Sequence, residues 1–338
     1  MTRRDVVLDA LAFRRPAYVP WSVSLTIECA DRLRRHLGSN DLGGFLDDHF
    51  VEVGSHIGRF ERVDDDHVRD RYGTVWDRSV DKDIGTPCDW PIQRPADLDR
   101  YRWPDATDDA WYDGIPETLA AATDRFRRYA IGFSLYERAW SMRGMTDLLM
   151  DLVDRPAFVD ELLDAICEHN LIQVRRAIDL GVDCLHFGDD YGMQTGLIMG
   201  LDNWRRFFKP RLARMFAPAV AAGKVVSMHS CGKVQALFDD LIEIGLNMFN
   251  PFQPEVMDVF AIQPAYHGRL AFHGGMSIQK TLPFGTVAEV RKMARRLVAL
   301  GADGGYVFSP SHAVPCDVPP ENLVAMMEVL TQQPGAGQ

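Results

Sequence analysis

The chain has 338 residues, of which 46% are hydrophobic and 25% are charged, which is the composition of a globular protein large enough for one domain. Its formal net charge of −11 argues against nucleic acids and anionic membranes as partners, because both require a basic surface. No apolar run approaches the roughly 20 residues needed to span a bilayer, and the amphipathic N-terminus predicts a helix rather than a secretory signal. We therefore expect a cytoplasmic protein, and its six scattered cysteines suit a reducing compartment.

Short apolar runs recur along the chain, each followed by polar residues and then by a helical pattern. The predicted strands cover residues 18–24, 129–134, 184–188, 225–228, 247–251, 270–272 and 306–309. Strands that alternate with helices of about 10–20 residues indicate parallel βα units. Seven such units favour a (β/α)8 TIM barrel, an α/β fold, although the pattern does not assign the eighth strand. An open doubly wound sheet is the alternative, but the chain lacks the Gly-rich phosphate loops expected of one.

Residues 40–104 do not follow this alternation of strands and helices. The alternation of Tyr72, Thr74 and Trp76 predicts a hairpin strand, and a Pro-rich stretch follows it. We therefore predict a single barrel domain over residues 1–338, with 40–104 as an inserted β-hairpin or loop region near the N-terminal third. This insertion is expected to cover one edge of the barrel mouth, either as a lid or as a surface loop without a role in substrate handling.

One group of potential metal ligands follows two of the predicted strands. His229 and Cys231 end the strand at 225–228, and Cys316 follows the last strand. One imidazole and two thiolates form a ligand set that suits zinc, and three protein ligands leave a tetrahedral ion one open position for chemistry. Zinc held by two thiolates is suited to binding a substrate thiol as the thiolate, which is the nucleophile that alkyl transfer needs.

Other polar and aromatic residues follow the strands at the same predicted mouth, the face where barrel enzymes assemble their sites. The candidate catalytic carboxylates are Glu137, Asp189 and Asp190. The candidate substrate-binding residues are Trp140, Tyr191, Gln253, His273 and His312. The polar ones could hold a substrate, orient a zinc ligand or supply the resting fourth ligand. For each polar residue the alternative is that it satisfies backbone groups at a strand end, and for the aromatic ones it is a place in the core.

Several sequence motifs carry a resemblance to a known family. They are residues 229–234 (HSCGKV), 246–258 (LNMFNPFQPEVMD), 272–276 (FHGGM), 282–286 (LPFGT) and 312–322, with Glu137-Arg-Ala-Trp and Gly188-Asp-Asp-Tyr-Gly upstream. These motifs resemble the uroporphyrinogen decarboxylase superfamily, and the H-x-C…C pattern is similar to its corrinoid-linked methyltransferase branch. The segment 21–28 lacks the arginines expected of the decarboxylase itself, so a porphyrinogen substrate is not expected.

This resemblance implies a zinc site on His229, Cys231 and Cys316. It also implies transfer of a methyl group from a methylated corrinoid, either on a partner protein or as free methylcobalamin, to a thiol or pterin acceptor, or transfer in reverse from a small methyl donor. A homodimer is a further expectation from size and family. Two alternatives stay open. One is a decarboxylase or demethylase of a small aromatic or carboxylated substrate that uses the mouth carboxylates and keeps turnover after Cys316→Ser. The other is a non-catalytic binding protein on a barrel scaffold.

Overall fold

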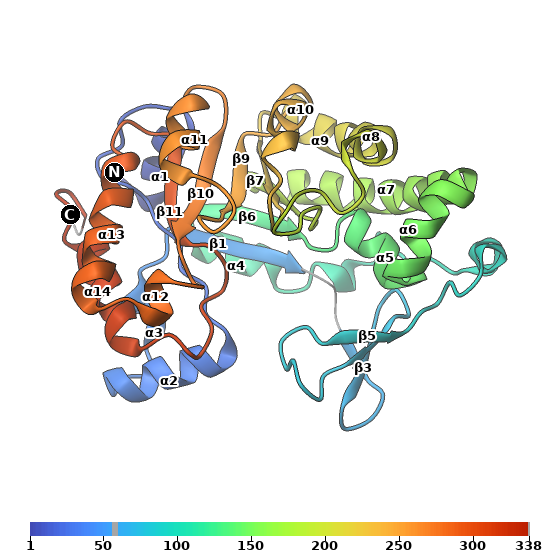
Figure 1. The fold of residues 1–338 in the computed structure, drawn as a ribbon, viewed down its shortest axis with the longest axis horizontal. Helices are drawn as coiled ribbons and strands as arrows, with labels where there is room; N and C mark the ends of the chain where they lie inside the picture. The colour runs from blue at the N-terminus through green and yellow to red at the C-terminus, as the bar shows by residue number, and fades with distance from the viewer. Residues whose placement is uncertain (56–59, 337–338) are drawn as a thin grey trace.

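Seven parallel strands form one curled sheet, a half-barrel, in this computed structural model, which describes residues 1–55 and 60–336 (Figure 1). Their order is β1-β6-β7-β8-β9-β10-β11, and each neighbouring pair is parallel. The bounds are β1 Phe50–Ser55, β6 Phe126–Ile131, β7 Cys184–Gly188, β8 Val225–His229, β9 Met248–Phe252, β10 Ala271–Met276 and β11 Tyr306–Pro310. The predicted parallel α/β organisation is therefore confirmed.

Helices connect the strands and cover the outside of the sheet (Figure 1). The longer ones are α1 Arg3–Leu11, α2 Ile27–Leu37, α5 Tyr136–Arg143, α6 Met145–Asp154, α7 Pro156–Asp179, α9 Lys209–Ala221, α13 Val287–Leu300 and α14 Pro320–Thr331. The shorter ones are α3 Leu42–Leu46, α4 Ile115–Ala121, α8 Leu201–Asn203, α10 Phe238–Glu243, α11 Val259–Ala265 and α12 Thr281–Phe284, with single turns or short non-α helices at Pro95–Arg100, Asp109–Trp111, Trp204–Phe208 and Gln235–Leu237. Local sequence sets several starts: Thr286 and Glu289 form a capping box that begins α13.

The first predicted strand, residues 18–24, is not a regular strand. Two isolated parallel bridges, Trp21 with Phe308 and Leu25 with Val314, hold this segment against β11 and the residues after it. On the other side, the amide of His49 donates to the carbonyl of Trp21 over 3.2 Å, just before β1 begins. The segment therefore lies between the two edges of the half-barrel, where an eighth strand would run. The sheet itself contains seven regular strands in the part of the chain that the structure describes.

Between β1 and β6 the chain forms a second, antiparallel sheet (Figure 1). Its strands are β2 Phe60–Arg62, β3 His67–Asp70, β4 Val75–Asp77 and β5 Thr86–Asp89. The insertion is thus shorter than the predicted range 40–104, because residues 50–55 pair with β6 as β1 of the main sheet. Arg138 of α5 fixes the small sheet to the barrel through a buried ion pair with Asp70 of 2.9 Å.

The interior of the half-barrel changes from apolar to polar along the strands. At the amino end, Val7 and Leu11 of α1 pack against a layer of buried strand residues: Phe50, Phe126, Cys184, Met248, Ala271 and Val307. Because side chains alternate along a strand, the residue two positions further faces the same interior. These next residues are polar on every strand: Glu52, Arg128, His186, Ser227, Asn250, His273 and Ser309. The apolar layer therefore closes the amino end, and the polar layer forms the floor of a cavity above it.

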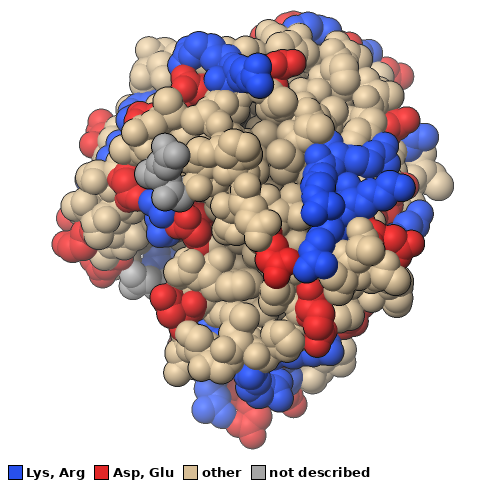
Figure 2. Space-filling view, turned by 90° about the vertical axis from the view of Figure 1, so that its left-hand side faces the viewer, with Lys and Arg blue, Asp and Glu red and all other residues tan. Residues whose placement is uncertain are grey.

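The surface carries charges of both signs. On the face shown in Figure 2, lysine and arginine side chains gather in separate clusters, each bordered by acidic side chains. Within the described residues, none of the helices combines the length and the apolar character that crossing a membrane requires.

Candidate metal centre

A cavity of about 360 Å³ opens at the carboxyl ends of the parallel strands. Of the residues singled out in the sequence, Glu137, Asp190, His229, His273 and His312 line it. This volume lies at the lower end of the range of small-molecule pockets, roughly 300–1,000 Å³. The cavity is therefore sized for a small substrate, and its position is the one where barrel enzymes place their active sites.

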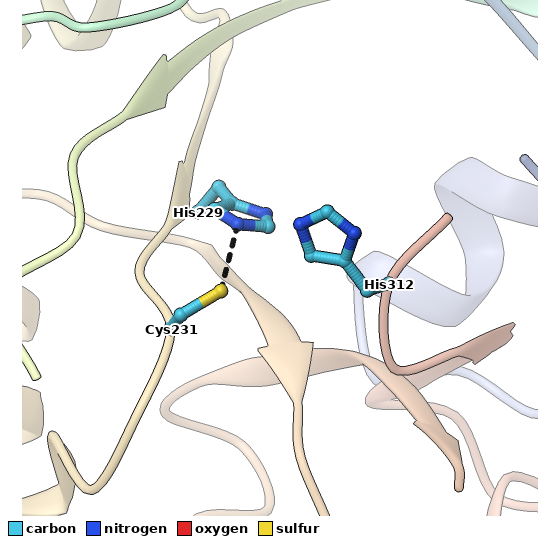
Figure 3. Close-up of side chains that lie close together, drawn as sticks. All are labelled: His229, Cys231 and His312. Atoms are coloured by element: carbon cyan, nitrogen blue, oxygen red, sulfur yellow. Dashed lines mark hydrogen bonds between the residues drawn. The ribbon is translucent and has the colours of Figure 1, made fainter. Parts of the chain in front are cut away.

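Three potential metal ligands converge beside this cavity (Figure 3). One ligand atom each of His229, Cys231 and His312 lies within 4.8 Å of the other two. The Nε2 atom of His229 is 3.3 Å from the Sγ atom of Cys231, and the imidazole rings of His229 and His312 have centroids 5.5 Å apart. Two imidazoles and a thiolate are ligands that zinc accepts, and three protein ligands leave one position for a substrate.

Two glycines place Cys231 beside His229, which is the last residue of β8. A Cβ atom on Gly232 would lie 2.4 Å from the carbonyl carbon of Gly192, and one on Gly192 would lie 2.5 Å from the carbonyl oxygen of Cys231. Gly232 also has a φ of 87°, in the left-handed region that favours glycine. The loops after β7 and β8 can therefore cross in backbone contact, and this crossing fixes the position of the thiol.

Asn250 of β9 sets the orientation of the His229 ring. Its Oδ1 atom is 2.7 Å from the Nδ1 atom of His229, and its Nδ2 atom donates to the carbonyl of His273 over 3.0 Å. The second bond assigns the amide orientation, so that Nδ1 of His229 carries the proton and Nε2 offers its lone pair towards Cys231. Metal-binding histidines typically donate their other N–H in this way. Asn250 is not among the site residues predicted from the sequence, although it lies within the motif 246–258.

Cys316, predicted as the third ligand, does not belong to this group. It is exposed, and its backbone carbonyl accepts a hydrogen bond of 2.6 Å from Arg32 of α2. Backbone hydrogen bonds from Thr26 to Val314 and from Val314 to Ser24 hold the preceding residues against the N-terminal segment. The structure thus brings together His229 and Cys231 as predicted, but places beside them His312, which was predicted to bind the substrate.

The three predicted catalytic carboxylates occupy different environments. Asp189 is fully buried and accepts from the amides of Tyr136 and Glu137, at 2.9 and 2.7 Å, so it stabilises the start of α5. Burial raises the pKa of Asp189 to about 6, while its hydrogen bonds oppose the shift. Glu137 faces the cavity, and burial together with the charge of Asp190 raises its pKa well above the usual value. Glu137 is therefore suited to carry a proton inside the cavity.

Asp190 lies directly beside the metal-ligand group. Its Oδ1 atom accepts from the amide of Cys231 over 2.8 Å and is 3.6 Å from the Nε2 atom of His229. Burial, followed by the charge of Asp190, raises the pKa of the Cys231 thiol. The thiol is therefore protonated without a metal, and a metal that binds it must displace the proton.

The remaining predicted substrate-binding residues differ in their access to the cavity. Tyr191 is fully buried, and its hydroxyl donates to Asp189 over 2.6 Å. Gln253 is buried and accepts from the amide of Gly232 over 3.1 Å, so it supports the loop that carries Cys231. Trp140 packs against Trp76 of the small sheet. None of these three lines the cavity described above, whereas His273 and His312 do.

The fold and the site together define an α/β-barrel-like protein with a polar cavity and a Cys/His group at the carboxyl ends of its strands. The sequence profile described as "Uroporphyrinogen decarboxylase (URO-D)" matches residues 81–333, which is most of the chain. The chain therefore belongs to the uroporphyrinogen decarboxylase family. The resemblance found in the motifs is confirmed.

Two known proteins are similar to this chain. Over 196 residues the chain is 22% identical to "Methylcobamide:CoM methyltransferase MtaA" of Methanosarcina barkeri, and the match covers 55% of each protein. The chain thus spans about half the length of this curated relative. A solved structure titled "methyltransferase from Methanosarcina mazei" superimposes with a TM-score of 0.73 at 16% identity, covering 98% of this chain and 99% of the other. This second likeness shows that the two proteins share a fold.

Proposed function

We propose that this protein is a zinc-dependent methyltransferase that moves a methyl group from a methylated corrinoid to a small thiol. The observation that carries the proposal is the convergence of His229, Cys231 and His312 at the cavity. Their nitrogen and sulfur donors fit zinc. The similarity to a methylcobamide-dependent methyltransferase supports the reaction class.

His229, Cys231 and His312 are the residues that would hold the zinc ion. Cys316 follows His312 by four residues on the same segment and is the alternative donor. When bound, zinc would supply a Lewis acid that stabilises a substrate thiol as its thiolate. The chain orients the ligand, because Asn250 keeps the His229 lone pair directed at the site. Glu137, which faces the same cavity, would in its carboxylate form accept the proton that the thiol gives up.

The corrinoid remains outside the cavity in this proposal. A space of about 360 Å³ accommodates a small thiol but not a corrin macrocycle with its nucleotide loop. The methyl–cobalt bond would therefore be presented at the mouth, either by a corrinoid protein or by free methylcobalamin. The protein's contribution is alignment of the thiolate with the methyl carbon, because cobalt(I) is a good leaving group.

A second candidate is a decarboxylase or demethylase that acts without zinc. The observation in its favour is Glu137, a carboxyl group with a raised pKa that faces the cavity and could act as a general acid. The two functions differ in their dependence on Cys231, because a zinc-free lyase does not use the thiolate.

The test combines measurement of the zinc content with an assay of methylcobalamin demethylation in the presence of 2-mercaptoethanol. Demethylation is monitored by the change in the visible absorbance of the corrinoid. We expect about one zinc ion per chain and zinc-dependent demethylation, both lost in Cys231→Ala and in His229→Ala. His312→Ala and Cys316→Ala identify the third ligand. The control is Cys88→Ala, which removes an exposed thiol on the small sheet. Demethylation that is equally fast without zinc, or in Cys231→Ala, would exclude the proposed reaction.

A further inference from the structure

The closed end of the cavity carries a partly buried cation whose hydrogen-bonding capacity is only partly used. Arg128 of β6 lines the cavity, and its Nη2 atom forms an ion pair of 2.5 Å with Glu52 of β1. The Nε and Nη1 atoms of Arg128 are buried and have no hydrogen-bond partner among the described residues. Most buried polar groups in proteins are hydrogen-bonded, so two unpaired donors on one guanidinium group need an explanation.

His273 of β10 has the same property at the same place. It is 2% exposed, lines the cavity, and neither ring nitrogen has a hydrogen-bond partner among the residues described. Burial, and next the charge of Arg128, lowers the pKa of His273, so the ring is neutral and offers one N–H donor.

Phe50 brings the two side chains together. The ring of His273 stacks on that of Phe50 with centroids 5.2 Å apart and an interplanar angle of 5°. The guanidinium carbon of Arg128 lies 5.3 Å from the centroid of the same Phe50 ring. Phe50 belongs to the apolar layer that closes the amino end. The side chains of Arg128 and His273 therefore lie at the floor of the cavity, while Glu137 and Asp190 follow the strands towards its mouth.

A guanidinium group and an imidazole N–H together suit the oxygens of an acid group, because charge-assisted hydrogen bonds to such oxygens are strong. We propose that Arg128 and His273 form a subsite for a carboxylate or sulfonate group of the small substrate. The ion pair with Glu52 holds the guanidinium group in place and compensates its charge when the subsite is empty. The acid group then lies at the floor, and the reacting end of the substrate points towards His229 and the mouth.

This inference rests on the proposed function only for the identity of the reacting end as a thiol. The subsite itself can be tested with acids that have no thiol. Butyrate and propane-1-sulfonate are titrated into the purified full-length protein by calorimetry, and the tighter of the two identifies which acid group the subsite prefers. We expect binding that weakens roughly 10- to 100-fold in Arg128→Gln, the effect of losing hydrogen bonds to a charged group.

The matched control is Arg127→Gln on the adjacent strand position. The side chain of Arg127 points to the other face of β6 and pairs with Asp183 at 3.3 Å, so this variant should bind both acids as the wild type does. Arg128→Gln also removes an ion-pair partner of Glu52, so a second variant guards against loss of folding. His273→Phe keeps a ring against Phe50 and removes both nitrogens, and we expect weaker acid binding with a native circular-dichroism spectrum.

Turnover adds a separate readout. For methyl transfer from methylcobalamin, KM for 3-mercaptopropionate should rise in Arg128→Gln, whereas KM for the neutral 2-mercaptoethanol should stay at its wild-type value. Acid binding without transfer to any thiol would support the subsite and refute the methyltransferase. Two results would refute the subsite alone, provided that the methyl group is still transferred to 2-mercaptoethanol. One is that neither acid binds to the wild type, and the other is that acid binding is unchanged in both variants.

Discussion

Replacing Asn250 by alanine tests whether the hydrogen bond to His229 prepares a metal ligand. The bond joins Oδ1 of Asn250 to Nδ1 of His229 at 2.7 Å, and it is the contact that assigns the proton to Nδ1. Without it, the His229 ring can rotate and can adopt the tautomer that carries a proton on Nε2, the atom facing Cys231. Both changes reduce the fraction of protein in which the lone pair points at the metal.

The expected loss follows from the effect of such supporting groups on metal affinity, which is on the order of 10- to 100-fold. This corresponds to about 1.4–2.8 kcal/mol of zinc binding free energy. The assay is a competition titration of zinc between the protein and a chromophoric chelator at pH 7.5. Far-ultraviolet circular dichroism checks that the variant is folded.

Asn247→Ala is the matched control, because Asn247 stands just before the same strand and accepts from the backbone amide of Val226 over 2.8 Å. It does not line the cavity. Asn247→Ala should bind zinc with wild-type affinity even where it lowers stability. Zinc affinity in Asn250→Ala within about threefold of the wild type would show that His229 is not oriented through this bond.

Three further substitutions address stability and the geometry of the site. Arg138→Met leaves the buried Asp70 carboxylate without its cation, so the free energy of unfolding in denaturant should fall by about 3–5 kcal/mol. Glu137→Gln should raise the unfolding temperature more at pH 8 than at pH 4. The pKa of Glu137 is higher in the folded protein than its value of 4.5 in the unfolded chain, so the wild type loses stability as the pH rises above 4.5. The glutamine variant avoids this loss. Gly232→Ala places a Cβ atom against the backbone of Gly192, and zinc affinity should fall as the loop that carries Cys231 is displaced.

Two of these substitutions have a comparison variant within the chain. Arg94→Met breaks an exposed ion pair with Asp97 and should leave the denaturation midpoint unchanged. Gly223→Ala also adds a side chain at a positive φ, but its Cβ atom would meet no atom within 4 Å, so zinc affinity should be retained. An unfolding temperature of Glu137→Gln that shifts equally at both pH values would contradict the raised pKa of Glu137.

The sequence predicts the parallel strands well because each is a compact apolar run followed by polar residues. It also predicts that His229 and Cys231 lie together, because His229 is the last residue of β8 and Cys231 follows it by two residues. It misses β1, where Glu52 faces the polar floor and breaks the expected apolar pattern. The segment 18–24 shows the opposite case: its apolar residues predict a strand, but Pro20 lacks an amide proton and the pairing with β11 stays limited to isolated bridges.

The third member of the metal-ligand group depends on contacts that are distant in sequence. Whether His312 or Cys316 faces the cavity is decided by the irregular segment after β11, which pairs with residues 24–26 and meets Arg32. No local pattern encodes that choice. The same holds for Asp189, which follows a strand like a catalytic residue but turns towards the first amides of α5.

The apolar layer that closes the amino end of the half-barrel has a kinetic consequence. With Val7, Leu11 and Phe50 blocking one end, a small substrate of the proposed methyltransferase would enter and leave the cavity at the carboxyl ends of the strands. A corrinoid docked at that mouth would block the same route. Binding of the two reactants would therefore follow a compulsory order, with the small molecule first to enter and its methylated product last to leave.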